Sequence, residues 1–184
     1  LRAAYIAAHL ANTMMLTGLM TGTIWWASQP AGASATHPGR SRGLAVTLAL
    51  TIVVAATGAA VALGDTLFPS ASLGAGLAED LSATSHFLIR LRVFHPILAI
   101  AVALVLIAQT RRDPTFAGER GESMRTIVRT LVLLQAELGV LNLLLLAPLA
   151  LQIAHLLGSN LLWIALVWSW MGGRTSNLQV TTNN

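Results

Sequence analysis

The chain has 184 residues, of which 55% are hydrophobic and only 10% are charged. Soluble domains carry about 25% charged residues, so this composition excludes a water-facing surface and places the chain in a lipid bilayer. The formal net charge of +4 comes from arginine alone, which predicts sparse charges at membrane rims and no nucleic-acid partner. The absence of cysteine excludes disulfides, thiolate metal sites and iron–sulfur clusters.

Five apolar stretches divide the chain, each close to the ~20 residues that a helix needs to cross a bilayer. In chain order they are residues 1–27, 44–63, 85–109, 126–146 and 149–171. The connections are a loop at 28–43, a longer loop at 65–85, a charged loop at 111–125 and a tight hairpin at Ala147-Pro148, and a polar tail follows at 172–184. This pattern predicts an all-α fold, a polytopic membrane helix bundle with five transmembrane helices.

The arginines outside the apolar stretches predict the orientation, because cytoplasmic loops are enriched in basic residues. Arginine occurs in the 28–43 loop, the 111–125 loop and the tail, whereas the 65–85 loop contains acidic residues and no arginine. We therefore predict a multi-pass protein of a prokaryotic cell (plasma) membrane, with those two loops and the C-terminus in the cytoplasm. The first, third and fifth helices then run from outside to inside.

Three histidines lie early in those three helices, at a similar depth toward the outer face. They are His9, His95 and His155. A titratable ring is costly in hydrocarbon without a partner, and two neutral imidazoles from facing helices can ligate a haem iron. We predict this for His95 and His155; the alternative is a pair of histidines hydrogen-bonded to neighbouring backbone. His9 has no facing histidine here, so its partner is expected upstream, whereas His86 is expected at the surface.

Two arginines, Arg90 and Arg92, break the positive-inside pattern just before His95. At the outer rim they need anions to pair with, and haem propionates would serve. Arg92 precedes His95 by three residues, so both point to one face of the helix. The alternative is that the two arginines extend to the membrane surface without a specific partner.

Two further patterns concern the helices. The fourth stretch carries Glu137 at mid-depth, which indicates either a proton path or a neutral carboxyl bonded to a neighbouring helix. The first and fifth stretches share a histidine-leucine pair near the start and tryptophans near the end. This echo predicts that residues 44–171 form a four-helix half, and that residues 1–27 are the last helix of a truncated N-terminal four-helix half. No phosphate loop, Asp-rich prenyltransferase motif or Ser/His/Asp grouping is present.

The order of these motifs resembles the haem A synthase family. The segments 58–69, 90–96, 135–148 and 155–163 resemble the family's fifth to eighth helices, and residues 1–27 resemble its fourth. The resemblance implies oxidation of a methyl group of haem O to the formyl group of haem A. It also implies that His95 and His155 ligate a resident haem B and that His9 is a catalytic residue at the substrate haem. Many members have arginine where this chain has Pro96, so Arg90 or Arg92 would replace it at the propionates.

The resemblance also implies partners and alternatives. The expected partners are the haem O substrate, membrane lipid, a haem O synthase or electron donor, and a second copy of the chain. We expect this portion to be inactive alone, because half of the substrate site has no counterpart in it. The alternative function is a b-type cytochrome subunit that only transfers electrons, and a third class is a membrane assembly subunit without haem.

Overall fold

The computed structural model describes residues 1–29, 41–82 and 84–172. All regular secondary structure in these ranges is helical, which confirms the predicted fold class. The helices are α1 (Arg2–Ala27), α2 (Arg42–Leu67), α3 (Leu73–Asp80), α4 (Phe87–Arg112), the short 3-10 helix η1 (Pro114–Phe116), α5 (Gly118–Leu144) and α6 (Leu149–Gly172). Most of the 28–43 loop and nearly all of the tail lie outside the described residues.

The helices differ from the sequence prediction in two connections. The 65–85 loop contains α3, which begins where the Ser72 hydroxyl accepts a hydrogen bond from the Ala75 backbone amide. The 111–125 loop is largely helical, because η1 occupies its centre and α5 starts at Gly118. Apolar length predicts only the part of a helix that lies in hydrocarbon, so a polar first turn outside it is missed. The tight hairpin is confirmed, with Leu146 and Ala147 at positive φ.

Four of the described helices, α2, α4, α5 and α6, are long and apolar enough to cross a membrane. The remaining long helix, α1, has 26 residues but is not among these four. Its four threonines and Asn12 interrupt the apolar residues, so it lacks an 18-residue stretch as apolar as those of the other four. The chain is therefore a membrane protein with four clear spans, and the fifth predicted span is a helix of sufficient length and lower hydropathy.

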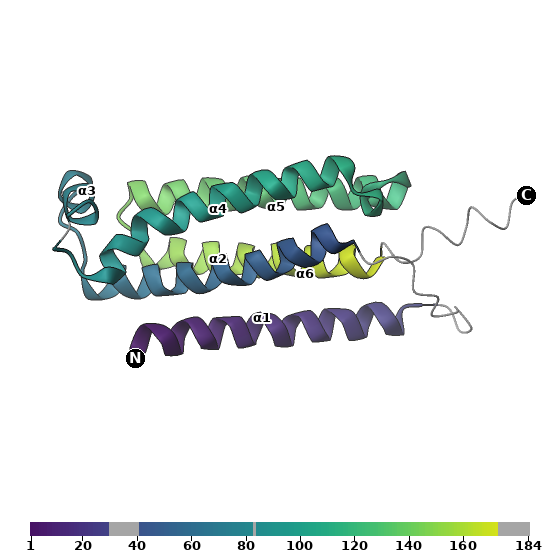
Figure 1. Ribbon diagram of the computed structural model, residues 1–184, viewed down its shortest axis with the longest axis horizontal. Helices are drawn as coiled ribbons and strands as arrows, with labels where there is room; N and C mark the ends of the chain where they lie inside the picture. Colours follow the sequence, from purple (N-terminus) through teal and green to yellow (C-terminus); the bar gives the residue numbers. More distant parts are fainter. Residues whose placement is uncertain (30–40, 83, 173–184) are drawn as a thin grey trace, which may run out of the picture.

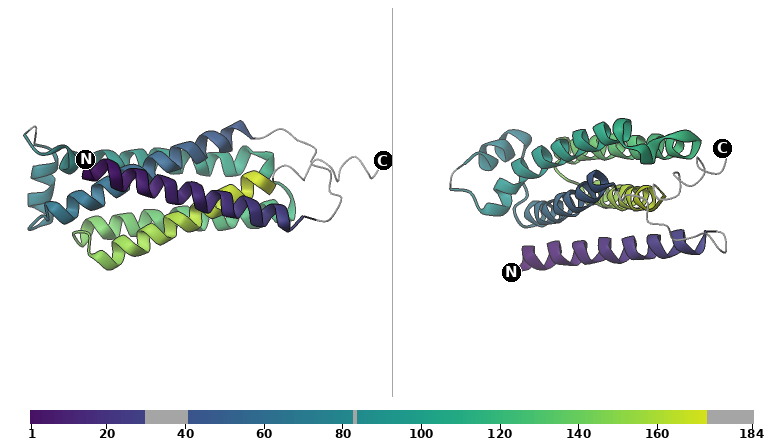
Figure 2. Two further views of the ribbon diagram at one scale, coloured as in Figure 1. Left: turned by 90° about the horizontal axis from the view of Figure 1, so that it is seen from below. Right: turned by 45° about the vertical axis from the view of Figure 1, so that its right-hand side comes forward.

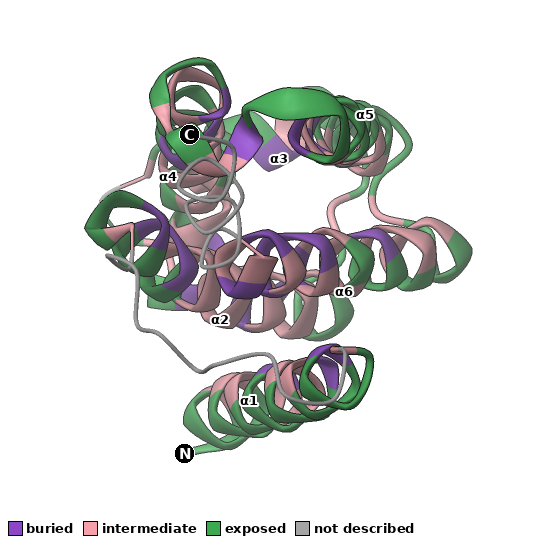
Figure 3. Ribbon diagram, turned by 90° about the vertical axis from the view of Figure 1, so that its right-hand side faces the viewer, coloured by how far each residue is buried: buried purple, intermediate pink, exposed green. Residues whose placement is uncertain are grey.

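The helices form three layers (Figure 1). The end-on view in Figure 3 shows α4 and α5 in one layer, α2 and α6 in the next, and α1 outside them. The closest pairs are α2 with α4 and α5 with α6, and α1 packs against both α2 and α6. Figure 2 shows α1 lying across this second layer. The helices that carry the three predicted histidines, α1, α4 and α6, all start at the end of the bundle where α3 lies.

The apolar core is concentrated toward the other end of the bundle. Its buried members come from η1, the start of α2, the first part of α5, the end of α4 and the middle and end of α1 and α6. They include Leu44, Leu106, Phe116, Val128 and Leu166. Apart from Met14 near the middle of α1, the largest fully buried side chains among the described residues lie in the half of the bundle away from α3. Packing therefore anchors one end and leaves the histidine end less densely filled.

Candidate functional site

His95, on α4, rests against α2. A Cβ atom built at Gly58 of α2 would lie 2.8 Å from Cε1 of His95 and 3.2 Å from its Nε2. The neighbouring Thr57 places its Oγ1 3.1 Å from Nδ1 of His95. Two consecutive residues of α2 therefore hold the ring, one by leaving space for it and the other by a polar contact.

The hydrogen bonds of Thr57 assign the protonated nitrogen of His95. The Thr57 hydroxyl donates its single proton to the carbonyl oxygen of Val54 at 2.8 Å. Its oxygen is left to accept, so Nδ1 of His95 is the donor in the contact with Thr57. Nε2 then keeps its lone pair, which is the form of imidazole that ligates a metal ion.

His155, on α6, rests against α5. A Cβ atom at Gly139 of α5 would lie 3.6 Å from Cε1 of His155, an ordinary contact distance. Nδ1 of His155 is buried and has no hydrogen-bond partner among the described residues. Because α2 and α6 also pack together, the α2–α4 pair and the α5–α6 pair adjoin. Each helix pair thus brings one histidine to the same part of the bundle.

These surroundings fit a flat macrocycle held by two imidazoles. Helix bundles bind haem between facing helices, with histidine nitrogens as axial ligands. Both rings sit on glycines, Nε2 of His95 keeps a lone pair, and Nδ1 of His155 lacks a partner. The densely packed core lies toward the opposite end. The residues present therefore fit a bis-histidine haem, although their ligation of iron stays a prediction.

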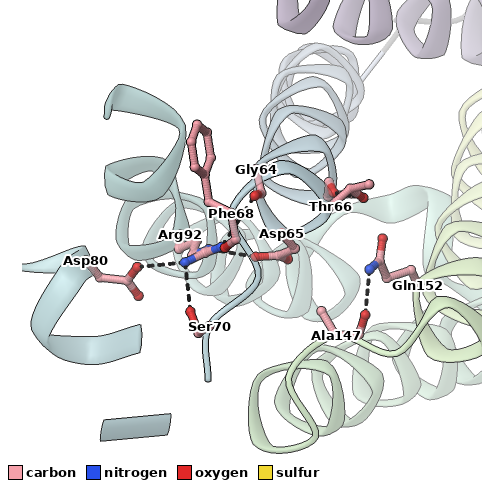
Figure 4. A network of polar contacts seen from close by, with 10 residues as sticks. Gly64, Asp65, Thr66, Phe68, Ser70, Asp80, Arg92, Ala147 and Gln152 are labelled. Carbon is pink, nitrogen blue, oxygen red and sulfur yellow. Dashed lines mark hydrogen bonds and ion pairs between the residues drawn. The ribbon is translucent and has the colours of Figure 1, made fainter. Parts of the chain in front are cut away.

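Arg92 has a role that the sequence did not predict. Its guanidinium has five N–H donors, and five protein oxygens lie within reach of them. The acceptors are Oδ1 of Asp65 at 2.6 Å, the Phe68 carbonyl at 2.6 Å, Oγ of Ser70 at 3.2 Å, Oδ1 of Asp80 at 3.5 Å and the Gly64 carbonyl at 3.5 Å. Figure 4 shows this network joining α4 to the end of α2 and to α3. A haem propionate would have to displace one of these acceptors.

The network around Arg92 is largely shielded from solvent. The side chain of Arg92 is 10% exposed, that of Asp65 is 22% exposed and that of Asp80 is 8% exposed. Burial raises the pKa of the Asp80 carboxyl, and the nearby Arg92 guanidinium opposes this effect without cancelling it. We call these three residues, together with Phe68 and Ser70, the Arg92 clasp.

The other predicted residues do not join the two half-buried imidazoles. Arg90 is exposed on the face of α4 that also carries Phe94 and Ile97. His9 is exposed on α1. His86 is the N-cap of α4, where its Nδ1 accepts a hydrogen bond from the Leu88 amide. The roles assigned to His9 and Arg90 therefore stay predictions.

Two contacts around the site were not predicted from the sequence. Thr57 was not singled out, because nothing in the sequence shows how α2 is rotated toward α4. Gln135 bonds the carbonyl oxygen of His155 through Nε2, at 3.0 Å. Glu137 is exposed, whereas Gln135 and Gly139 face α6. The three- and four-residue spacing from Gln135 through Gly139 to Asn142 was the available signal for a face directed at α6.

The fold and the site define a class, a polytopic helical membrane protein with two histidines inside the bundle. The chain belongs to the COX15-CtaA family of cytochrome oxidase assembly proteins, whose family model matches residues 1–167. Together with a haem A synthase among the relatives, this match confirms the resemblance drawn from the sequence.

Three curated relatives were compared. Proteins named protoheme IX farnesyltransferase from two strains of Thermus thermophilus are each 36% identical to the chain over 179 residues. This match covers 91% of the chain but 28% of each relative. A heme A synthase from Caulobacter vibrioides is 36% identical over 107 residues, covering 56% of the chain and 30% of the relative. The chain thus spans less than a third of these relatives. No solved structure matches it significantly.

Proposed function

We propose that the chain is the C-terminal portion of a haem A synthase, which oxidises a methyl group of haem O to the formyl group of haem A. In this proposal His95 and His155 ligate a resident haem B, and His9 lies at the substrate haem in an upstream half. The observation that carries the proposal is the pair of half-buried imidazoles, each in contact with the position of a glycine on a neighbouring helix. The family match and the Caulobacter relative support the reaction.

The chain's own residues would position the two imidazole rings and set the protonation state of His95. Converting methyl to formyl removes electrons, and a bis-histidine haem carries electrons one at a time. Thr57 holds the proton on Nδ1 of His95 and so leaves Nε2 free for iron. Gly58 and Gly139 give the two rings room against α2 and α5. The Arg92 clasp fixes the start of α4 one helical turn before His95.

The name of the Thermus relatives raises a second activity, farnesyl transfer to protohaem. Prenyl diphosphates are usually bound through Mg²⁺ held by clustered carboxylates. In residues 1–29, 41–82 and 84–172, no group of three or more His, Cys, Asp or Glu side chains is placed to hold a metal ion. We therefore assign farnesyl transfer to the parts of those relatives that the chain does not match. Haem O is the substrate in this proposal, so the partner that we propose is the haem O synthase that makes it.

The orientation is part of the proposal. With the arginine-rich 111–125 segment in the cytoplasm, the α3 end of the bundle faces outward. The three histidine-bearing helices start at that end (Figure 1). In this proposal the histidines, which come early in those helices, therefore lie toward the outer face.

The test supplies haem O to membranes that contain the complete protein and measures haem A by chromatography. We expect haem A to form, and its formation to stop in His95→Ala, His155→Ala and His9→Ala. The control is His86→Ala, because His86 caps α4 and should leave the reaction intact. Haem B retention with no conversion of haem O, even in the complete wild-type protein, would instead support the electron-transferring cytochrome.

A further inference from the structure

Three buried polar atoms without a hydrogen-bond partner among the described residues lie between α5 and α6. They are Nδ1 of His155, Oε1 of Gln135 and Oδ1 of Asn142. The other ends of the two amides face α6: Nε2 of Gln135 donates to the His155 carbonyl at 3.0 Å, and Nδ2 of Asn142 donates to the Leu151 carbonyl at 3.3 Å. Each amide therefore has a satisfied nitrogen and an unsatisfied oxygen at the same interface.

Gly139 leaves space between these two amides. Leaving aside its chain neighbours and the nearby backbone of α5, a Cβ atom built there meets one described heavy atom within 4 Å, Cε1 of His155 at 3.6 Å. In the imidazole ring Cε1 is bonded to both nitrogens, so the space beside Gly139 adjoins the unpartnered Nδ1 as well as Nε2. Buried polar atoms in native proteins are almost always hydrogen-bonded, and a buried water commonly supplies about three such bonds.

We propose that one ordered water occupies the space beside Gly139, accepts a hydrogen bond from Nδ1–H of His155 and donates one to Oε1 of Gln135. The remaining buried acceptor for its second proton is Oδ1 of Asn142. The inference rests on the proposed function, because ligation of iron through Nε2 is what leaves the proton on Nδ1 of His155. The water then satisfies all three buried atoms at once.

This water makes Gln135 a positioning residue for His155, as Thr57 is for His95. A hydrogen bond from the outer ring nitrogen fixes the orientation of a ligating imidazole and makes its inner nitrogen a stronger donor. The two ligands are therefore supported differently, His95 by a direct hydroxyl contact and His155 through water. Gln135 acts through its buried oxygen, while its nitrogen holds α6 in place.

Two variants of the complete protein separate the water from the amide–backbone bond. Gln135→Leu removes both the bond to the His155 carbonyl and the water's acceptor. Gly139→Ala keeps the Gln135 bond and fills the water's space, and its Cβ meets His155 at an ordinary contact distance. The matched control is Gln152→Leu, because Gln152 also donates through Nε2 to a backbone carbonyl, that of Ala147 at 2.6 Å.

The measurements are the haem dissociation constant, from titration of haem into the apoprotein, and the midpoint potential of the bound haem. We expect both variants to weaken haem binding about tenfold or more and to shift the potential to more positive values, because loss of such outer partners costs 10–100-fold in metal affinity. Gln152→Leu should change neither quantity. A structure that resolves ordered waters should show one within hydrogen-bond distance of Nδ1 of His155 and Oε1 of Gln135.

Two results distinguish failure of this inference from failure of the proposed function. If His155→Ala loses the bis-histidine spectrum while Gln135→Leu and Gly139→Ala match the control, the water is wrong and the ligand assignment stands. If His155→Ala keeps that spectrum, His155 is not a ligand and the proposed function is wrong with it.

Discussion

Replacement of Arg92 by glutamine should destabilise the fold strongly, whereas the same replacement of Arg90 should not. Arg92 is 10% exposed and forms a 2.6 Å ion pair with Asp65 and a 3.5 Å ion pair with Asp80. Removing one partner of a buried ion pair costs about 3–5 kcal/mol, because a charge is left without compensation. Protonation of one carboxyl can relieve part of this cost, so we expect about 3 kcal/mol for Arg92→Gln. Arg90 is exposed, and Arg90→Gln should change stability by less than about 0.5 kcal/mol.

The assay is equilibrium unfolding of the purified protein in mixed micelles, followed by circular dichroism. If Arg92→Gln unfolds within about 0.5 kcal/mol of Arg90→Gln, the Arg92 clasp is not a stabilising element and the reasoning from its burial is refuted. The same unfolding measurement is made on the protein with and without bound haem. If the cost of Arg92→Gln appears only in the haem-loaded protein, the guanidinium acts on the cofactor, as the propionate prediction requires.

Three further predictions follow from single contacts. Gly58→Ala should weaken haem binding in a spectroscopic titration, because its Cβ would lie 2.8 Å from Cε1 of His95 and displace the ring; affinity equal to wild type would contradict that seating. Trp163→Phe should lower the free energy of unfolding by about 1–2 kcal/mol, because it removes the buried 2.6 Å bond from Nε1 to the Met14 carbonyl, and an unchanged unfolding curve would refute this. The pKa of Asp80 is raised in the folded state, so the folded state binds its proton more tightly than the unfolded state does. The unfolding free energy of wild type should therefore fall relative to that of Asp80→Asn as the pH rises from about 4 to 7. A difference between the two unfolding free energies that stays constant over this range would show that the pKa is not raised.

The bundle was predictable because hydrocarbon imposes a strong constraint on the sequence. A helix must be apolar over about 20 residues to cross a bilayer, so α2, α4, α5 and α6 are visible as uninterrupted stretches. The constraint does not apply outside the membrane. For that reason α3 and the polar start of α5 were assigned to loops, although a serine cap and ordinary helix-forming residues produce helices there.

The sequence singles out the titratable residues of the candidate site, whose roles stay predictions, and it does not show how their neighbours contact them. His95 and His155 stand out because an imidazole within an apolar helix is costly without a partner. Gly58 stands out as a small residue suited to close packing, but its contact with His95 and that of Thr57 depend on how α2 is rotated against α4. The acidic residues Asp65 and Asp80 are evident in the sequence. Their contacts with the guanidinium of Arg92 are not, because they depend on the path of the chain through α3.

The central claim is that His95 and His155 ligate one iron atom, and the visible spectrum of the haem-loaded protein tests it most directly. We predict the sharp reduced band of a six-coordinate bis-histidine haem, which each of His95→Ala and His155→Ala abolishes and His86→Ala preserves. A band that survives in either of the first two variants would contradict the assignment.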